Sequence, residues 1–214
     1  MCTGNVGVKF AAAILCAGAC FAQQWEIGGT LGYGWYRGVR VNGPGEQASA
    51  GIRNRFAAGA VITEDLYEHV SGEFRYMYHD GDPYLSLGGK TANMQGQSHS
   101  FTYETLIHVR GLDYRLRPFV AAGIGAKYYR TTGPEPSPQP APREATLVRA
   151  NEWELLVGIG GGVTYRLRDD LLVRFDIRDY ITPFPKRLFV EANGSTDRGL
   201  FQQFTPMFGV SYTF

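Results

Sequence analysis

The chain has 214 residues, with 21 Lys or Arg against 20 Asp or Glu, so its formal net charge at pH 7 is +1. This balance gives no electrostatic basis for binding nucleic acid, which needs an excess of basic side chains. The mean hydropathy of −0.20 excludes a bundle of apolar membrane-spanning helices. It does not exclude a membrane β-barrel, in which every second strand residue faces lipid.

The N-terminal segment has the pattern of a secretory signal. Lys9 precedes an apolar run of 13 residues that ends at Ala22, shorter than the ~18 residues of a membrane-spanning helix. Small side chains at Cys20 and Ala22 predict cleavage after Ala22. We therefore expect a signal peptide at residues 1–22 and one mature domain at residues 23–214, which has no net formal charge once Lys9 is removed.

The three cysteines, Cys2, Cys16 and Cys20, all lie in the segment expected to be removed. A mature chain without them has no disulfide and no Cys-ligated metal, and we expect no cofactor. In an alternative interpretation Cys20 is retained as a lipidated N-terminus, although residues 17–19 lack the Leu usual in that motif.

Beyond this segment, apolar and polar side chains alternate with a period of two, which predicts strands with two different faces. Eight such stretches, each near the ~10 residues of a tilted membrane strand, cover residues 24–36, 52–62, 67–79, 99–110, 117–130, 152–166, 171–180 and 201–214. No stretch shows a helical period. The predicted fold class is all-β, an eight-stranded antiparallel up-and-down barrel.

The connections between these stretches alternate between long and short, at about 15, 4, 19, 6, 21, 4 and 20 residues, a rhythm typical of transmembrane barrels. The long connections, residues 36–49, 80–98, 131–151 and 181–200, are predicted to be external loops. The short ones, residues 63–66, 111–116 and 167–170, are predicted to be turns on the side of both termini. Five alternating prolines between Pro134 and Pro142 predict an extended, projecting spacer in the third loop, with a recognition arm as the alternative.

Side-chain volume decides which face points outward. An eight-stranded barrel has an interior that side chains just fill, so the aromatic face is predicted to meet lipid. Aromatic residues gather near the strand ends, which resembles two interfacial girdles. The predicted girdle residues are Trp25, Trp35, Tyr78, Phe101, Tyr128, Trp153 and Tyr165.

The opposite face carries acidic and basic side chains in nearly equal numbers, which predicts a paired interior network because an unpaired buried charge is costly. Its predicted members are Glu26, Arg55, Glu73, Arg75, Glu104, Lys127, Glu154, Arg166, Arg174, Asp176 and Arg178. The network either locks the barrel or gates a narrow ion-conducting pore, and the sequence leaves both open. Gly158 to Gly162 lie within a strand, where we expect strand curvature and close packing instead of a phosphate loop.

The C-terminal pattern Phe208, Val210, Tyr212 and Phe214 resembles the assembly signal of Gram-negative outer-membrane β-barrels. The stretches 117–125 and 174–180 are similar to strands of the OmpA/OmpX-like family. This resemblance implies a cell outer-membrane protein that contacts outer-membrane lipids and is inserted by the barrel-assembly machinery. It also implies a structural or surface-interaction role, with an extracellular ligand reached through the loops. A porin-like pore and a lipid A-modifying enzyme are the alternatives.

No catalytic, cofactor-binding or metal-ligating residue is predicted, and we expect a protein that is not an enzyme. His69, His79, His99 and His108 lack the short spacing of metal ligands. His99 and Ser100 suggest a catalytic pair, but adjacent strand residues point to opposite faces and cannot form a dyad directly.

Overall fold

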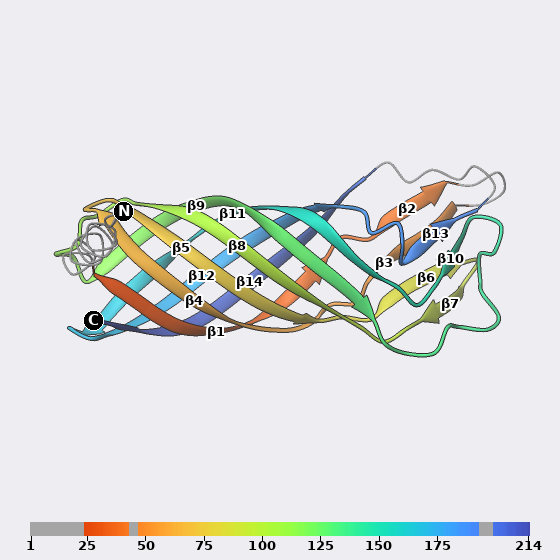
Figure 1. The fold of residues 1–214 in the computed structure, drawn as a ribbon, viewed down its shortest axis with the longest axis horizontal. Coiled ribbons are helices and arrows are strands. Elements are labelled where there is room, and N and C mark those ends of the chain that lie inside the picture. Colours follow the sequence, from red (N-terminus) through yellow and green to blue (C-terminus); the bar gives the residue numbers. More distant parts are fainter. Residues whose placement is uncertain (1–23, 43–46, 193–198) are drawn as a thin grey trace, which may run out of the picture.

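The computed structural model describes residues 24–42, 47–192 and 199–214, and the expected signal peptide, residues 1–22, lies outside this part. The described chain is all-β, as predicted. Its main body is a closed antiparallel barrel with the strand order β1-β14-β12-β11-β9-β8-β5-β4 (Figure 1). The strands are β1 Trp25–Tyr36, β4 Arg55–Tyr67, β5 Val70–Asp80, β8 Gly96–His108, β9 Leu116–Thr131, β11 Asn151–Arg168, β12 Leu171–Pro183 and β14 Leu200–Thr213.

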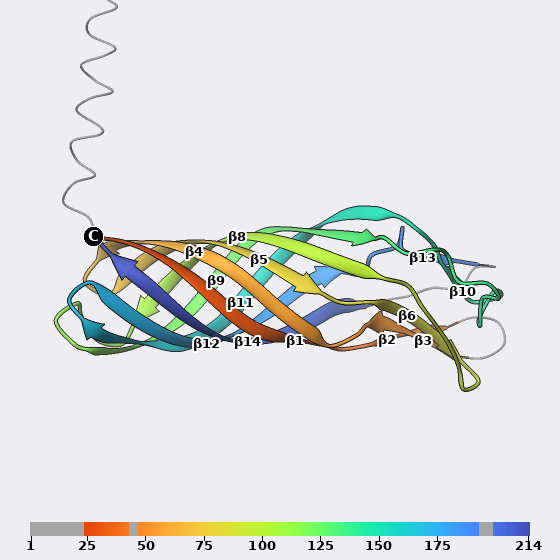
Figure 2. The same cartoon turned by 90° about the horizontal axis from the view of Figure 1, so that it is seen from below.

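Each strand pairs with its neighbours in sequence, and β1 closes the barrel by pairing with β14. Trp25 and Phe214 exchange backbone hydrogen bonds of 2.9 and 3.2 Å at one end, which we call the turn end. The long connections gather at the opposite end, which we call the cap end (Figure 2). The alternation of short turns and long loops therefore separates the two ends of the barrel as the sequence predicts.

The first turn is displaced from its predicted position at residues 63–66. Strand β4 continues to Tyr67 and the turn is formed by Glu68 and His69. The polar residues that suggested a turn have partners within the barrel wall and interior. Thr63 donates to Glu73 Oε2 at 3.0 Å, and Glu64 Oε1 accepts from the Tyr103 hydroxyl at 3.0 Å.

The four long connections, predicted only as external loops, contain two further sheets. Strands β2 Val39–Asn42, β3 Gln47–Ile52, β6 Pro83–Leu87 and β7 Lys90–Asn93 make a four-stranded sheet in this order. Strands β10 Ala145–Leu147 and β13 Phe189–Glu191 make a two-stranded sheet. The β6–β7 turn contains Gly88 and Gly89 with φ of 55° and 80°, a conformation that favours glycine in tight hairpins. We call these strands and their connections the cap.

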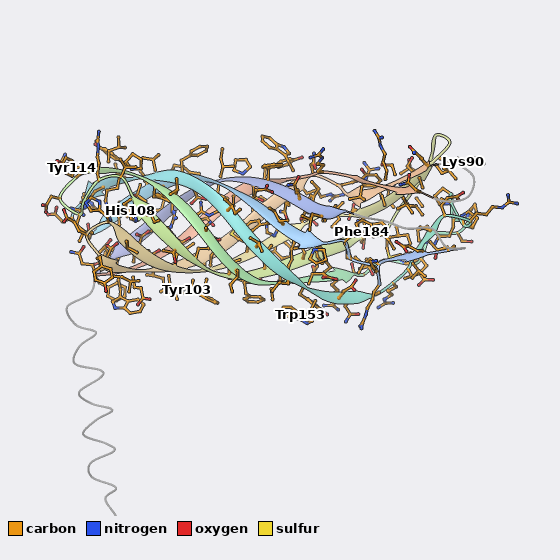
Figure 3. The ribbon with its side chains drawn as sticks, turned by 90° about the horizontal axis from the view of Figure 1, so that it is seen from above. Lys90, Tyr103, His108, Tyr114, Trp153 and Phe184 are labelled. Carbon is orange, nitrogen blue, oxygen red and sulfur yellow. The ribbon has the colours of Figure 1, made fainter. Side chains whose placement is uncertain are left out.

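The cap has its own apolar core, which is continuous with the barrel interior. Buried side chains from all four loops pack together with Tyr129 of β9 and Phe201 of β14. Phe201 lies 6.1 Å from Phe184 and 5.6 Å from Tyr36, measured between ring centroids. A packed hydrophobic cluster therefore lies over the barrel mouth. Figure 3 shows the position of Phe184, one of its members, between the barrel and the outer part of the cap.

The proline-rich segment belongs to this cap. Its C-terminal part is held by contacts, whereas Pro134, Pro138 and Pro142 are exposed. Ala141 is fully buried in the cap core. The Gln139 side chain donates to Leu147 O at 2.8 Å and accepts from Leu147 N at 3.2 Å. These contacts hold the segment against β10.

Candidate functional site

The candidate site is a cluster of six charged side chains in the barrel interior, contributed by β5, β8 and β12. Glu73, Arg75, Glu104, Arg174, Asp176 and Arg178 are each no more than 2% exposed. Three carboxylates face three guanidinium groups, so the cluster is formally neutral. Residues two apart in a strand share a face, which explains why Glu73 lies beside Arg75 and why Arg174, Asp176 and Arg178 form one row.

Charge-assisted hydrogen bonds link the three strands across the interior. Arg174 Nη1 donates to Glu73 Oε2 at 2.6 Å, and Arg178 Nε donates to Glu104 Oε2 at 2.7 Å. Arg75 Nη2 lies 2.7 Å from Glu73 Oε1 and 3.1 Å from Asp176 Oδ2. Strands β5 and β8 are neighbours in the wall, whereas β9 and β11 separate β8 from β12 on one side and β14, β1 and β4 separate β12 from β5 on the other. The bonds from Arg174 and Arg178 therefore brace the barrel through its centre.

Glycines in β9 and β11 leave the space that this cluster fills. A Cβ atom on Gly160 would lie 2.7 Å from Arg178 Cδ, and one on Gly123 would lie 2.8 Å from Glu104 Cγ. A Cβ atom on Gly162 would lie 2.5 Å from Asp176 Cβ. The glycine-rich stretch of β11 is thus a packing surface for long charged side chains.

Buried apolar side chains lie on both sides of the cluster. Towards the cap lie Ala57, Met77, Leu156, Tyr180 and Met207, all buried. Towards the turn end lie Leu106, Phe119 and Ala121. The guanidinium carbons of Arg174 and Arg178 sit 5.5 and 5.4 Å from the Phe119 ring centroid, within the range of a cation–π interaction.

Glu26 lies at the edge of the cluster, with Oε1 3.8 Å from Arg174 Nη1. Sequence analysis placed four further residues in one network, and the structure places them elsewhere along the barrel axis. Arg55 is exposed and pairs with Asp80 and Asp82 at 3.2 and 2.5 Å. Glu154 is partly exposed. Arg166 donates to Leu112 O at the turn end, at 2.8 Å.

Lys127, the fourth of these residues, is buried on the cap side of the barrel. Its Nζ donates to Gln203 Oε1 and lies 5.2 and 5.0 Å from the ring centroids of Tyr36 and Tyr129. Within the described part of the chain it makes no ion pair. Its neighbours come from three different strands, β1, β9 and β14.

A second polar group at the turn end was missed by sequence reasoning. Ser71 Oγ donates to Asp65 Oδ1 at 2.6 Å and contacts His108 Nε2 at 2.9 Å. The carboxylate contacts the serine instead of His108 Nδ1, which has no hydrogen-bond partner among the described residues. This is not the order of a Ser-His-Asp triad, in which the acid orients the histidine. The misplaced first turn hid the register that joins Asp65 to Ser71.

His99 and Ser100 lie on opposite sides of the wall, as face alternation requires. Ser98 and Ser100 are buried inside, at 2% and 1% exposure. His99 is on the outer face, where Nδ1 lies 2.8 Å from the Tyr76 hydroxyl. The geometry provides no serine nucleophile for this histidine.

The predicted girdle residues lie on the outer face. Trp35, Phe101 and Trp153 are exposed near the cap end, and Tyr165 is exposed near the turn end. Trp25, Tyr78 and Tyr128 are partly exposed on the same face. The C-terminal residues Phe208, Val210, Tyr212 and Phe214 also point outward and are exposed. Among the described residues, no helix is long and apolar enough to cross a bilayer, and no group of three or more His, Cys, Asp or Glu is suited to a metal ion.

Comparison with known proteins identifies the fold. No family model and no curated protein sequence matches the chain. The outer membrane protein OprG from Pseudomonas aeruginosa superposes with a TM-score of 0.56 at 14% identity, covering 89% of this chain and 95% of that one. Neisserial surface protein A gives a TM-score of 0.51 at 9% identity, covering 89% and 97%.

The N-terminal β-barrel domain of Pseudomonas aeruginosa OprF gives a TM-score of 0.50 at 14% identity, covering 89% and 97%. These likenesses, together with the closed eight-stranded wall, define the class: a small β-barrel of the outer-membrane type. More particularly, the chain has the eight-stranded fold of the OmpA/OmpX-like barrels, as the resemblance in the sequence implied.

Proposed function

We propose that this chain is an outer-membrane protein in which the barrel is a closed, structural anchor and the cap is the functional, surface-exposed part. The observation that carries the proposal is the filled interior. The charged cluster lies between two buried apolar layers, and a third apolar layer covers the mouth. Buried side chains, charged, polar and apolar, fill the described interior of the barrel, which supports an anchor instead of an open channel.

The outer wall supports the membrane location. Large apolar side chains are exposed around the barrel, among them Leu31, Ile124, Leu155, Phe175 and Phe208. Soluble proteins rarely expose contiguous apolar surfaces of this extent. The expected signal peptide, residues 1–22, and the C-terminal assembly pattern are further parts of the proposal, since both belong to export and insertion.

The location and orientation are tested by labelling. The full chain is expressed, so that cleavage of the signal peptide during export removes all three cysteines. Single cysteines are introduced as Lys90→Cys in the cap and Asp113→Cys in a turn. On intact cells a membrane-impermeant maleimide should label the first variant and not the second. Equal labelling of both variants, or recovery of the protein without detergent, contradicts the proposed arrangement.

The closed interior is tested by conductance in planar bilayers. The folded protein, recognised by a faster gel mobility before boiling, should give no discrete conductance steps. The alternative is a narrow pore gated by the charged cluster. Steps that change when Glu73→Ala or Arg174→Ala is introduced would establish that alternative and reject the anchor.

A lipid-modifying activity is not part of the proposal. His99 faces outward, whereas Ser98 and Ser100 face the interior, so the outer face offers no serine to activate at this position. Expression without any change in lipid A mass is the result expected from this arrangement.

A further inference from the structure

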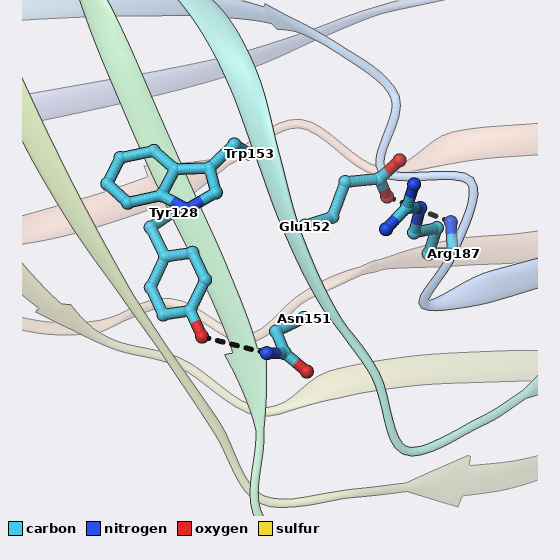
Figure 4. A pocket seen from close by; sticks show the side chains of 5 residues that line it. All are labelled: Tyr128, Asn151, Glu152, Trp153 and Arg187. Carbon is cyan, nitrogen blue, oxygen red and sulfur yellow. Dashed lines mark hydrogen bonds between the residues drawn. The ribbon is translucent and has the colours of Figure 1, made fainter.

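A pocket of about 640 Å³ opens at the cap end of β9 and β11 (Figure 4). Tyr128 lines it from β9, Asn151, Glu152 and Trp153 from the start of β11, and Arg187 from the segment between β12 and β13. Its volume lies in the range of small-ligand sites, about 300–1,000 Å³. None of these residues belongs to the buried charged cluster.

Two aromatic rings form one wall of the pocket. The ring centroids of Tyr128 and Trp153 lie 4.9 Å apart at an interplanar angle of 36°, and Trp153 is 59% exposed. The negative face of an aromatic ring attracts weakly positive hydrogens. The C–H face of a sugar ring carries such hydrogens and matches the flat surface of an indole.

The remaining residues supply both donors and acceptors. Asn151 Nδ2 donates to the Tyr128 hydroxyl at 3.0 Å, which orients the amide and leaves its carbonyl oxygen for a ligand. Glu152 Oε2 accepts from the backbone N–H of Arg187 at 2.8 Å, and these two residues line the pocket from the other side of β11, because Glu152 and Trp153 are adjacent in the strand. A hydroxyl both donates and accepts, so the hydroxyls of a sugar ring on the aromatic wall can pair with the Asn151 amide and the Tyr128 hydroxyl. One acidic and one basic side chain give no net preference for a purely ionic ligand.

The surroundings of the pocket indicate which kind of molecule carries the sugar ring. The aromatic wall continues into the barrel's outer face, where Phe101 stacks on Trp153 at 6.2 Å. Below it lie Ile124 and Leu155, both 67% exposed, and beyond it lies the polar cap. An occupant with a sugar at the pocket and acyl chains along β9 and β11 would match both parts of this surface.

We propose that the pocket binds a saccharide ring in the head group of a glycolipid of the surrounding leaflet. The inference rests on the proposed membrane orientation, with the cap end at the outer surface. It adds a defined ligand site to the general contact between the barrel and lipid.

The test uses the three tryptophans of the chain, Trp25, Trp35 and Trp153. In the W25F/W35F variant Trp153 is the sole tryptophan and reports on the pocket. In the W25F/W153F variant Trp35, which is 53% exposed on β1, is a matched reporter outside it. Both proteins are placed in nanodiscs of phospholipid alone or of phospholipid with increasing mole fractions of a purified outer-leaflet glycolipid, and emission and iodide quenching are measured.

We expect the glycolipid to shift the emission of Trp153 and protect it from iodide, with little change at Trp35. Asn151→Ala, introduced beside Trp153, should raise the half-saturating mole fraction about tenfold, the equivalent of a lost hydrogen bond. Asn42→Ala in the cap is the control and should not change it. The free head-group oligosaccharide should compete with the glycolipid.

Equal protection of both tryptophans would show general contact with lipid instead of binding at the pocket and would overturn the proposal. Protection of neither tryptophan would also overturn it. Binding of the free oligosaccharide without binding of the glycolipid would assign the pocket to a soluble sugar and overturn the lipid assignment. Failure of the oligosaccharide to compete would overturn the saccharide assignment. Failure of the barrel to show its folded gel band in nanodiscs would instead contradict the proposed function, so the two failures are distinguishable.

Discussion

Arg178 Nε lies 2.7 Å from Glu104 Oε2, although β9 and β11 separate their two strands in the barrel wall. Both side chains are fully buried, so the desolvation cost of each charge must be offset by its ion-pair partners. Breaking a buried pair by removing one partner costs about 3–5 kcal/mol, whereas replacing both by apolar groups is often tolerated. The pair therefore makes a sharp test of the braced interior.

Glu104→Ala should lower the free energy of unfolding by about 3–5 kcal/mol, because it leaves the Arg178 guanidinium without its nearest carboxylate. The double variant Glu104→Leu with Arg178→Met should lose less than the single variant. Loss of the folded gel band with rising urea concentration measures both. Glu68→Ala is the control, because the Glu68 side chain is 70% exposed. An equal loss in the single and double variants would show that the pair is not what stabilises this layer.

Gly160→Ala should destabilise the barrel by about 1–3 kcal/mol, the usual cost of overpacking. A Cβ atom at this position would lie 2.1 Å from Ile177 O and 2.7 Å from Arg178 Cδ. The matched control is Gly29→Ala, whose nearest neighbour would be Gly59 O at 3.9 Å. Thermal loss of the folded gel band should shift for the first variant only, and equal tolerance of both would contradict the packing role of Gly160.

Lys127→Met should leave the thermal midpoint unchanged or raise it. The amine is buried with Gln203 and two tyrosine rings, and a buried cation without a carboxylate carries an uncompensated desolvation cost. Lys127→Ala should lower the midpoint, because it leaves a void beneath the cap. A loss in the methionine variant as large as in the alanine variant would show that the charge itself is required.

Phe189→Ala should loosen the cap and spare the barrel. Phe189 is 1% exposed and packs in the cap core, 4.9 Å from the Phe184 ring. The expected result is faster trypsin cleavage after the cap residues Arg143, Arg149 or Arg187, with the folded gel band retained. Val190→Ala is the control, because Val190 is 44% exposed on the same strand. Simultaneous loss of cap protection and folded band would show that the two parts unfold as one unit.

Phe214→Ala should reduce the yield of folded protein in membranes more than it reduces stability. The Phe214 side chain is 71% exposed, so it contributes little to the packed interior, and the proposed assembly role acts before folding is complete. Leu200→Ala, at the other end of β14 and 66% exposed, is the control. A normal folded yield in cells for Phe214→Ala would contradict the assembly role.

The strand count and the identity of each face could be predicted from sequence because a period of two is a local property. The position of a residue along the barrel axis could not be predicted in this way. Arg55, Glu154 and Arg166 have the inward parity of Glu104 yet lie near the strand ends. Parity says which face a residue occupies, whereas depth depends on the register and tilt of neighbouring strands.

The cap was missed for a different reason. Its strands are three to six residues long, too short for alternation to be recognised. Two of its pairings, β3 with β6 and β10 with β13, join loops that are distant in sequence. Ser49 pairs with Ser86, and Thr146 with Val190. Composition also could not predict where the proline-rich segment is held, because this depends on the hydrogen bonds between Gln139 and Leu147.

The pairing of β3 with β6 and of β10 with β13 joins the first loop to the second and the third loop to the fourth. Strand pairing therefore joins the four loops two by two, and the common cap core packs the two pairs together. A relative that diverges in one member must adjust the other, or an unsatisfied strand edge is left facing water. A surface loop exchanged between such barrels would accordingly need to be exchanged together with the loop that it pairs with.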